Sequence, residues 1–259
     1  MKESGIPAGK KWFEACKTNN KAMEKSKAKI FLNEERGLHE TEWCRSFRIF
    51  NFDDYFNEHK APFRNLYIFN DEVLAGGQSL RMNVGEDSFV ILLPVTGAIK
   101  INDEQSEGEL IHAGQARIFN TAKDSYIEIA NPYETELVNF LQIWIKEKPE
   151  VALPHTGVAN FNLKDNKDKL VAITPGKENA SMGPFCCVIG KFAGRTDVLY
   201  KLTNVQAGVF VYIIEGAFEV QNRLLHAKDG LALWDLSMLE AEALSNDAIL
   251  LIIELPDYG

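Results

Sequence analysis

The chain has 259 residues, 46% of them hydrophobic, which is enough to bury a core in one large domain or in two domains of about 100–150 residues each. Its net charge of −9 excludes a general electrostatic attraction to nucleic acid or anionic lipid, so we expect neither direct nucleic-acid binding nor membrane association. The first residues lack the apolar run of a secretory signal, and no apolar stretch is long enough to cross a bilayer, so the sequence predicts a cytoplasmic protein.

The chain changes character several times along its length. Residues 1–27 are rich in lysine and weakly patterned, and we expect them to form an N-terminal extension. Residues 28–148 contain short runs of β-branched and aromatic residues, such as "DSFVILLPVTGAIKIN" and "ELVNFLQIWIKE", separated by Gly, Asn, Asp and Pro. This spacing is typical of an all-β sandwich or barrel.

A polar stretch divides the chain into two halves. Residues 149–169 contain two prolines and several Asn, Asp and Lys residues, and we interpret them as a linker. Residues 170–259 again contain strand-like runs. The segment "FVILLPVTGAIKIN" of the first half resembles "FVYIIEGAFEVQN" of the second, and "ELIHAGQARIF" resembles "RLLHAKDGLALW". This internal similarity predicts one β-unit that is used twice, and therefore two related barrels.

The four cysteines, Cys16, Cys44, Cys186 and Cys187, form no C-x-x-C pair. Buried free thiols are the favoured interpretation, and a redox or zinc-binding role is the alternative.

Several segments together resemble a known family. "EERGLHETEWCRSFRIFNFDDYF" is similar to its opening segment, "FLQIWI" to the strand that leaves its first barrel, and "GLALWD" and "LLIIELP" to the end of its second barrel. On these segments the chain resembles the pirin and quercetin 2,3-dioxygenase-like two-barrel proteins of the cupin superfamily. The resemblance implies an all-β bicupin, with two antiparallel barrels of the jelly-roll type in one chain.

The resemblance also implies where a metal would bind, and there the sequence departs from the family. Members bind Fe, Ni or Cu through a His-x-His pair and a glutamate between two glycines, here Gly77 and Gly97. The two histidine positions are Asn83 and Gly85, and the glutamate position is Phe89 or Val90.

A later His-x-Glu completes the pirin-like site. Its positions here are Ile127 and Ile129, while Asn131 is kept. Such a metal needs three or four imidazole or carboxylate donors, so we expect no metal cofactor.

The expected pocket of the first barrel follows from the same alignment. Its predicted ligand-binding residues are Arg81, Asn83, Gly85, Ile127, Ile129 and Gln142, whereas no catalytic residue can be named. Strand alternation would turn Ser79 and Arg81 inward together with positions 83 and 85, and would turn Glu128 outward. Arg81 then either holds a small anionic or carbonyl ligand or points to water or to Glu86.

The other titratable residues give weaker signals. The histidines His39, His59, His112, His155 and His226 are scattered; we expect His112 and His226 to face solvent, and His39 and His155 have substrate contact as an alternative role. Asp53 and Asp54 favour a turn over a catalytic carboxylate pair.

Taken with the resemblance, the sequence favours a pirin-like protein with a degenerate, metal-free first barrel. It would act as a small-molecule-binding or regulatory protein, on an unknown small molecule or through a partner protein. The alternatives are a quercetin 2,3-dioxygenase-type oxidoreductase with unexpected ligands and a metal-free isomerase or lyase. A purely structural role is the remaining possibility.

Overall fold

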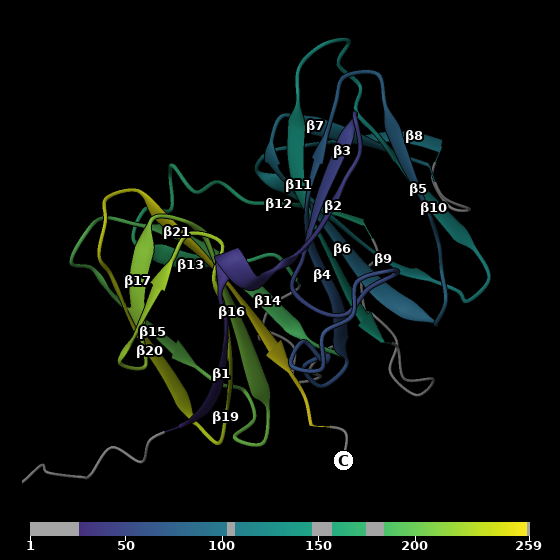
Figure 1. The fold of residues 1–259 in the computed structure, drawn as a ribbon. Helices are drawn as coiled ribbons and strands as arrows, with labels where there is room; N and C mark the ends of the chain where they lie inside the picture. Colours follow the sequence, from purple (N-terminus) through teal and green to yellow (C-terminus); the bar gives the residue numbers. More distant parts are fainter. Residues whose placement is uncertain (1–25, 103–106, 147–156, 175–183, 258–259) are drawn as a thin grey trace, which may run out of the picture.

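The computed structural model describes residues 26–102, 107–146, 157–174 and 184–257 (Figure 1). Within these ranges the chain forms twenty-one β-strands and one short 3-10 helix, η1 (Asn33–Glu35). All strand pairs are antiparallel and form four sheets, so the predicted all-β architecture with two antiparallel barrels is confirmed. In the described part of the chain no helix is long and apolar enough to span a membrane.

The first barrel consists of a seven-stranded sheet and a four-stranded sheet. The larger sheet contains, in spatial order, β12 (Gly157–Asn160), β9 (Gln115–Thr121), β6 (Ser88–Thr96), β11 (Val138–Lys146), β4 (Leu66–Leu74), β3 (Cys44–Arg48) and β2 (Gly37–Glu40). The smaller sheet contains β5 (Ser79–Asn83), β10 (Tyr126–Ala130), β7 (Ala98–Asn102) and β8 (Glu107–His112).

The second barrel repeats this plan with one strand fewer. Its larger sheet contains β1 (Lys27–Phe31), β19 (Gly230–Trp234), β16 (Gly208–Glu215), β21 (Ala248–Leu255), β14 (Cys186–Phe192) and β13 (Lys169–Ala172). Its smaller sheet contains β15 (Asp197–Lys201), β20 (Met238–Ala243), β17 (Ala217–Val220) and β18 (Arg223–His226). The two segments that were expected to be repeats, β6–β7 and β16–β17, occupy equivalent places in the two barrels.

Two strands cross the expected domain boundaries. Residues 27–31 form β1, which pairs with β19 of the second barrel (Figure 1). Residues 157–160, within the expected linker, form β12, which pairs with β9 of the first barrel. Each strand covers a sheet edge that would otherwise expose unpaired backbone groups. The rest of the expected extension, residues 1–25, and the linker residues 149–156 lie outside the described residues.

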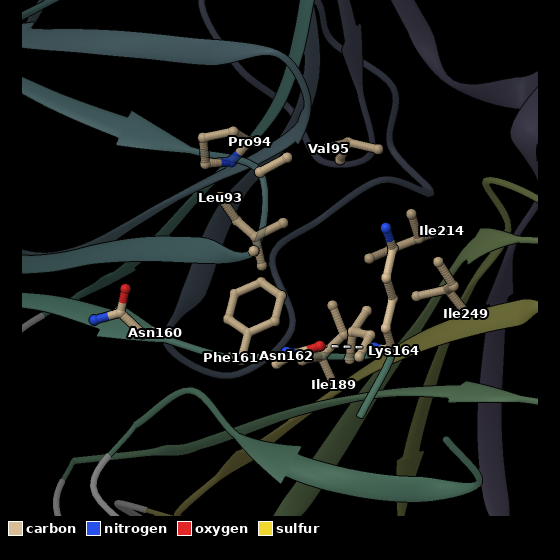
Figure 2. A pocket seen from close by; sticks show the side chains of 13 residues that line it. Leu93, Pro94, Val95, Asn160, Phe161, Asn162, Lys164, Ile189, Ile214 and Ile249 are labelled. Carbon is tan, nitrogen blue, oxygen red and sulfur yellow. Dashed lines mark hydrogen bonds between the residues drawn. The ribbon is translucent and has the colours of Figure 1, made fainter. Parts of the chain in front are cut away.

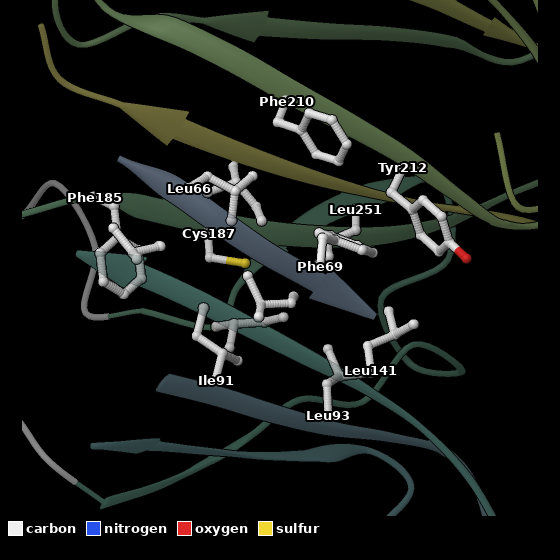
Figure 3. Packing of buried hydrophobic residues seen from close by; sticks show 14 of the residues in the cluster. Leu66, Phe69, Ile91, Leu93, Leu141, Phe185, Cys187, Phe210, Tyr212 and Leu251 are labelled. Atoms are coloured by element: carbon white, nitrogen blue, oxygen red, sulfur yellow. The ribbon is translucent and has the colours of Figure 1, made fainter. Parts of the chain in front are cut away.

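The two large sheets pack face to face and share one hydrophobic core. Phe69 on β4 contacts Tyr212 and Phe210 on β16, with ring centroids 4.6 Å and 5.3 Å apart (Figure 3). Cys187 lies in the same core as a free thiol, Cys44 is also buried and free, and Cys186 is half-buried and free, whereas Cys16 lies outside the described residues. Separate apolar clusters fill the inside of each barrel.

A polar cluster also joins the barrels. Asp71 on β4 accepts hydrogen bonds from the Tyr212 hydroxyl at 3.2 Å and from Asn139 Nδ2 at 2.5 Å. The ammonium of Lys228 lies 3.0 Å from Asp71 Oδ2, and the guanidinium of Arg36 lies 3.4 Å from it. Burial, and then the negative charge of Asp71, raise the pKa of Tyr212 well above its usual value. This buried carboxylate is therefore fully partnered.

Candidate ligand site inside the first barrel

A cavity of about 410 Å³ opens inside the first barrel. Its walls are formed by inward side chains of β3, β4 and β11, by residues 80–83 of β5, and by the segment that follows β3. This volume is within the range of small-molecule sites.

Strand register places two polar layers on the inner face of the large sheet. Ser46 on β3 lies opposite Glu72 on β4, and Arg48 lies opposite Asn70, which lies opposite Gln142 on β11. Because alternate residues of a strand point to the same face, all five side chains point into the barrel. None exposes more than 5% of its surface, so each polar group needs a partner inside the protein.

Glu72 is the centre of the first layer. Its Oε1 accepts a hydrogen bond from the Ser46 hydroxyl at 2.9 Å and another from Gln142 Nε2. The indole of Trp144 donates to Gln142 Oε1 at 3.1 Å, which fixes the orientation of the amide. The second carboxyl oxygen of Glu72, Oε2, has no hydrogen-bond partner within the described residues.

The surroundings of Glu72 change its acidity. Burial raises the pKa of Glu72 to about 7, against the opposing effect of the polar groups of Gln142, Ser46 and Asn70 and of the charge of Arg48. A carboxyl group with such a pKa can both donate and accept a proton near neutral pH.

Arg48 supplies a buried positive charge beside this carboxyl group. Its Nη1 donates to the carbonyl of Phe52 at 2.9 Å and to Asp54 Oδ1 at 2.5 Å, and its Nη2 lies 3.5 Å from Asp53 Oδ2. Asp53 and Asp54 therefore sit in a turn, as the sequence predicted, where they hold the guanidinium. The hydrogen bond from Arg48 lowers the pKa of Asp54.

Four buried polar atoms of this cluster lack a partner in the described part of the chain: Glu72 Oε2, Arg48 Nε, and both side-chain amide atoms of Asn70. Buried polar atoms without hydrogen bonds cost about 1–3 kcal/mol each, so such atoms are rare in folded proteins. Because these atoms are concentrated in one barrel, they indicate a binding site for a polar molecule, either water or a ligand.

Cys44 lines the same cavity but is a poor nucleophile. Burial raises its pKa to about 12, the negative charge of Glu72 adds to this effect, and Arg48 opposes it. Because the thiolate is the reactive form, a thiol with this pKa is inert at neutral pH.

The residues that were predicted to line the pocket separate into three groups. Gln142 lies at its centre, as described. Arg81 and Asn83 lie at its rim, where both are exposed and the guanidinium of Arg81 stacks on the ring of Tyr126 at 3.9 Å. Ile127 and Ile129 are fully buried in the apolar cluster of the barrel, and Gly85 is exposed away from the cavity.

The predicted inward direction of Ser79, Arg81 and positions 83 and 85 is wrong. Met82 and Val84 are buried, whereas the odd-numbered residues from 79 to 85 are exposed. The cause is register: Met82 lies opposite Ile127, and residues that face each other in a sheet share a side. Glu128, opposite Arg81, faces outward as expected.

The four residues that the sequence resemblance placed at metal positions would not suit Fe, Ni or Cu. Asn83 and Gly85 are exposed, whereas Ile127 and Ile129 are buried and carry no donor atom. Within the described ranges, no three His, Cys, Asp or Glu side chains are grouped so that they could hold a metal ion.

The histidines contribute little to this site. His39 lies at the rim, with Nδ1 3.7 Å from Asp54 Oδ2. His112 and His226 are exposed, as predicted, and His155 lies outside the described residues.

Four residues of this site, Ser46, Arg48, Asn70 and Glu72, were not predicted from the sequence. The signal was present in "LYIFNDEVL", where three polar residues interrupt an apolar strand. Alternation along that strand puts Asn70 and Glu72 on one face and Asp71 on the other.

Comparisons with known proteins agree with the fold. Residues 187–255 match the family model of the quercetinase C-terminal cupin domain. The quercetin 2,3-dioxygenase of Escherichia coli K12 is 22% identical over 225 residues, which are 86% of this chain and 96% of the relative. A pirin-like protein of Caulobacter vibrioides is 24% identical over 216 residues, which are 81% of this chain and 92% of the relative.

Solved structures show the same architecture. The crystal structure of YhhW from Escherichia coli has a TM-score of 0.77 at 20% identity and covers 89% of this chain and 98% of its own. A second structure, of bacterial pirin YhhW in complex with nickel(II), has a TM-score of 0.74 at 20% identity and covers 89% and 99%.

Proposed function

We propose that this chain, a pirin-like, quercetinase-like two-barrel protein of the cupin superfamily, binds a small polar molecule inside its first barrel with Glu72 at the centre of the site. The observation that carries the proposal is the buried Glu72 Oε2, which has no hydrogen-bond partner in the described residues and belongs to a side chain that lines a cavity of about 410 Å³.

The chemistry of the unpartnered atoms indicates what the ligand must offer. Glu72 Oε2 accepts a hydrogen bond when the carboxyl group is ionised and can donate one when it is protonated, whereas Arg48 Nε only donates. A ligand that carries both a donor and an acceptor satisfies both groups. Leu80 and Met82 on β5 supply apolar contacts on the other side.

Binding in this proposal needs no metal ion. The solved relative YhhW is described in complex with nickel(II), but the matching positions here offer one amide and two buried isoleucines. Recognition therefore rests on the polar side chains of β3, β4 and β11.

Metal-free acid–base chemistry is a second candidate function, of the isomerase or lyase class. The observation that favours it is the pKa of Glu72, raised by burial to about 7, because a group with this pKa can move a proton to and from a bound molecule at neutral pH. Turnover would then follow the ionisation of Glu72 in its pH profile, and Glu72→Gln would abolish it.

A ligand screen tests the binding function. Flavonoids and small organic acids are added to the purified full chain, and the melting temperature is measured; a ligand that binds only the folded state raises it. Each hit is then compared in the wild type, in Glu72→Gln, and in the control Glu128→Gln, which changes a carboxylate on the outer face of β10.

We expect hits to stabilise the wild type and the control but not Glu72→Gln. Equal stabilisation of all three proteins by every hit, or the absence of any hit, would contradict the proposal.

A further inference from the structure

A second and larger cavity, of about 570 Å³, lies between the two barrels (Figure 2). Both barrels contribute to its wall: Leu93 and Val95 come from β6, and Ile189, Ile214 and Ile249 come from β14, β16 and β21. Phe161, in the segment between β12 and β13, closes one side. Of the thirteen described residues that line the cavity, six carry branched aliphatic side chains and only Asn160, Asn162 and Lys164 are polar, so the wall is mainly apolar.

Among the described residues that line this cavity, Lys164 is the only charged one. Its side chain is exposed, extends across the cavity in Figure 2, and forms no salt bridge with a described residue. The polar neighbours are already engaged, because Asn162 Nδ2 donates to Asp165 at 2.7 Å and Asn160 Oδ1 accepts from Gln115 at 2.8 Å. The ammonium group of Lys164 therefore lies beside the apolar part of the cavity without a salt-bridge partner among the described residues.

We propose that this cavity binds a free amphipathic monocarboxylate, with an aliphatic body in the apolar part of the cavity and its carboxylate at Lys164. A mainly apolar wall favours a flexible hydrocarbon body over a polar or multiply charged one. A single ammonium, with no arginine and no carboxylate among the described residues of the wall, matches a single negative charge. The inference is independent of the first-barrel site, because the two cavities share no lining residue.

Titration calorimetry on the full chain tests the inference, with octanoate, decanoate and octan-1-ol as probes below their aggregation limits. Each added methylene that becomes buried should tighten binding about fourfold, so decanoate should bind about sixteenfold more tightly than octanoate. Lys164→Gln should weaken octanoate about fivefold, as expected for an exposed ion pair, and should leave octan-1-ol unchanged.

Two matched variants locate the effect. Lys167→Gln removes an exposed lysine that does not line the cavity, and it should leave octanoate binding unchanged. Glu72→Gln should also leave it unchanged, which separates this inference from the function proposed for the first barrel.

The proposal is overturned if decanoate shows no saturable binding, if affinity does not increase with chain length, or if Lys164→Gln and Lys167→Gln weaken octanoate equally. The chain-length comparison uses only wild-type protein, so it stands even if a variant fails to fold.

Discussion

The two barrels share one strand order but differ inside. In the first barrel Glu72 lies opposite Phe140 on β11, and in the second barrel the equivalent residue, Gly190, lies opposite Leu250 on β21. Gly190 has no room for a side chain, because an added Cβ would lie 2.5 Å from Cε2 of Phe192. An aromatic ring thus fills in one barrel the space that a carboxylate and a cavity occupy in the other.

The second barrel also buries a carboxylate, but a satisfied one. Glu254 on β21 is fully buried; its Oε2 accepts from the Tyr200 hydroxyl at 2.6 Å, and its Oε1 accepts from the Thr203 amide at 2.8 Å and the Asn204 amide at 3.2 Å. Burial alone therefore does not mark a site. Two features together indicate a ligand site: a buried carboxyl oxygen that lacks a hydrogen-bond partner, and a side chain that lines a cavity. Among the described carboxylates, only Glu72 has both features.

The largest expected effect comes from removing the satisfied carboxylate. Glu254→Ala should destabilise the protein by about 4 kcal/mol, because it leaves several buried donors unpaired. Urea denaturation at pH 7 measures the change, with Glu215→Ala, at an exposed position on β16, as the control. A loss below about 1 kcal/mol would mean that water replaces these hydrogen bonds and that the contrast with Glu72 is smaller than we state.

Titration of Glu72 should change folding stability by nearly as much as the Glu254→Ala substitution. The sign is opposite to that of a salt-bridged carboxylate, whose contribution to stability grows as pH rises. Its pKa rises from 4.5 in the unfolded chain to about 7 in the folded one, so the folded state holds a proton that the unfolded state has lost. Stability should therefore fall as pH rises from about 4.5 through 7, by about 3 kcal/mol in total.

Glu72→Gln removes this dependence. The difference in unfolding free energy between the variant and the wild type should move by about 3 kcal/mol in favour of the variant between pH 4.5 and pH 8. A constant difference across this range would show that Glu72 titrates as an ordinary glutamate.

Packing in the second barrel provides a smaller effect. Gly190→Ala should cost about 2 kcal/mol, since the new methyl group would meet Phe192 and the carbonyl of Lys169, 2.8 Å away. Gly85→Ala in the first barrel has no atom within 4 Å of its new methyl group and should change stability little. Equal thermal denaturation midpoints for the two variants would show that the ring of Phe192 moves aside at little cost and that Gly190 is not required by packing.

The smallest expected effect concerns metal. The purified protein should hold no stoichiometric Fe, Ni or Cu in its first barrel, and chelators should leave its melting temperature unchanged, because the residues expected at the metal positions offer at most the amide oxygen of Asn83. Elemental analysis before and after EDTA treatment checks this. A stoichiometric ion whose removal lowers the melting temperature would show that other residues supply the ligands.

The sequence predicted the architecture well because it depends on repeated local patterns. Apolar runs of strand length, turn residues between them and the match between β6–β7 and β16–β17 were enough to predict two related β-barrels, and the family resemblance implied that these are antiparallel. The pairing of β1 with the second barrel and of β12 with the first was not predictable in this way, because the sequence of a short edge strand does not indicate which strand it pairs with.

The site was predicted only in part. Gln142 was identified, but the facing of β5 was wrong by one residue, because a register shift of one reverses every side chain and register with β10 cannot be read from one strand alone. Glu72 could not be predicted, because the partners of its carboxyl group lie on strands β3 and β11, which are far from β4 in the sequence, and the lack of a partner for Oε2 depends on how these strands pair.

The central proposal is that Glu72 is a buried carboxyl group that binds a small polar ligand. Carbon-13 NMR of glutamate carboxyl groups tests it most directly, with the resonance of Glu72 assigned by its loss in Glu72→Gln. We predict that this resonance titrates near pH 7 in the free protein and shifts when a hit from the ligand screen is added. A Glu72 that titrates near its ordinary value, or that does not respond to any ligand that binds, would contradict the account.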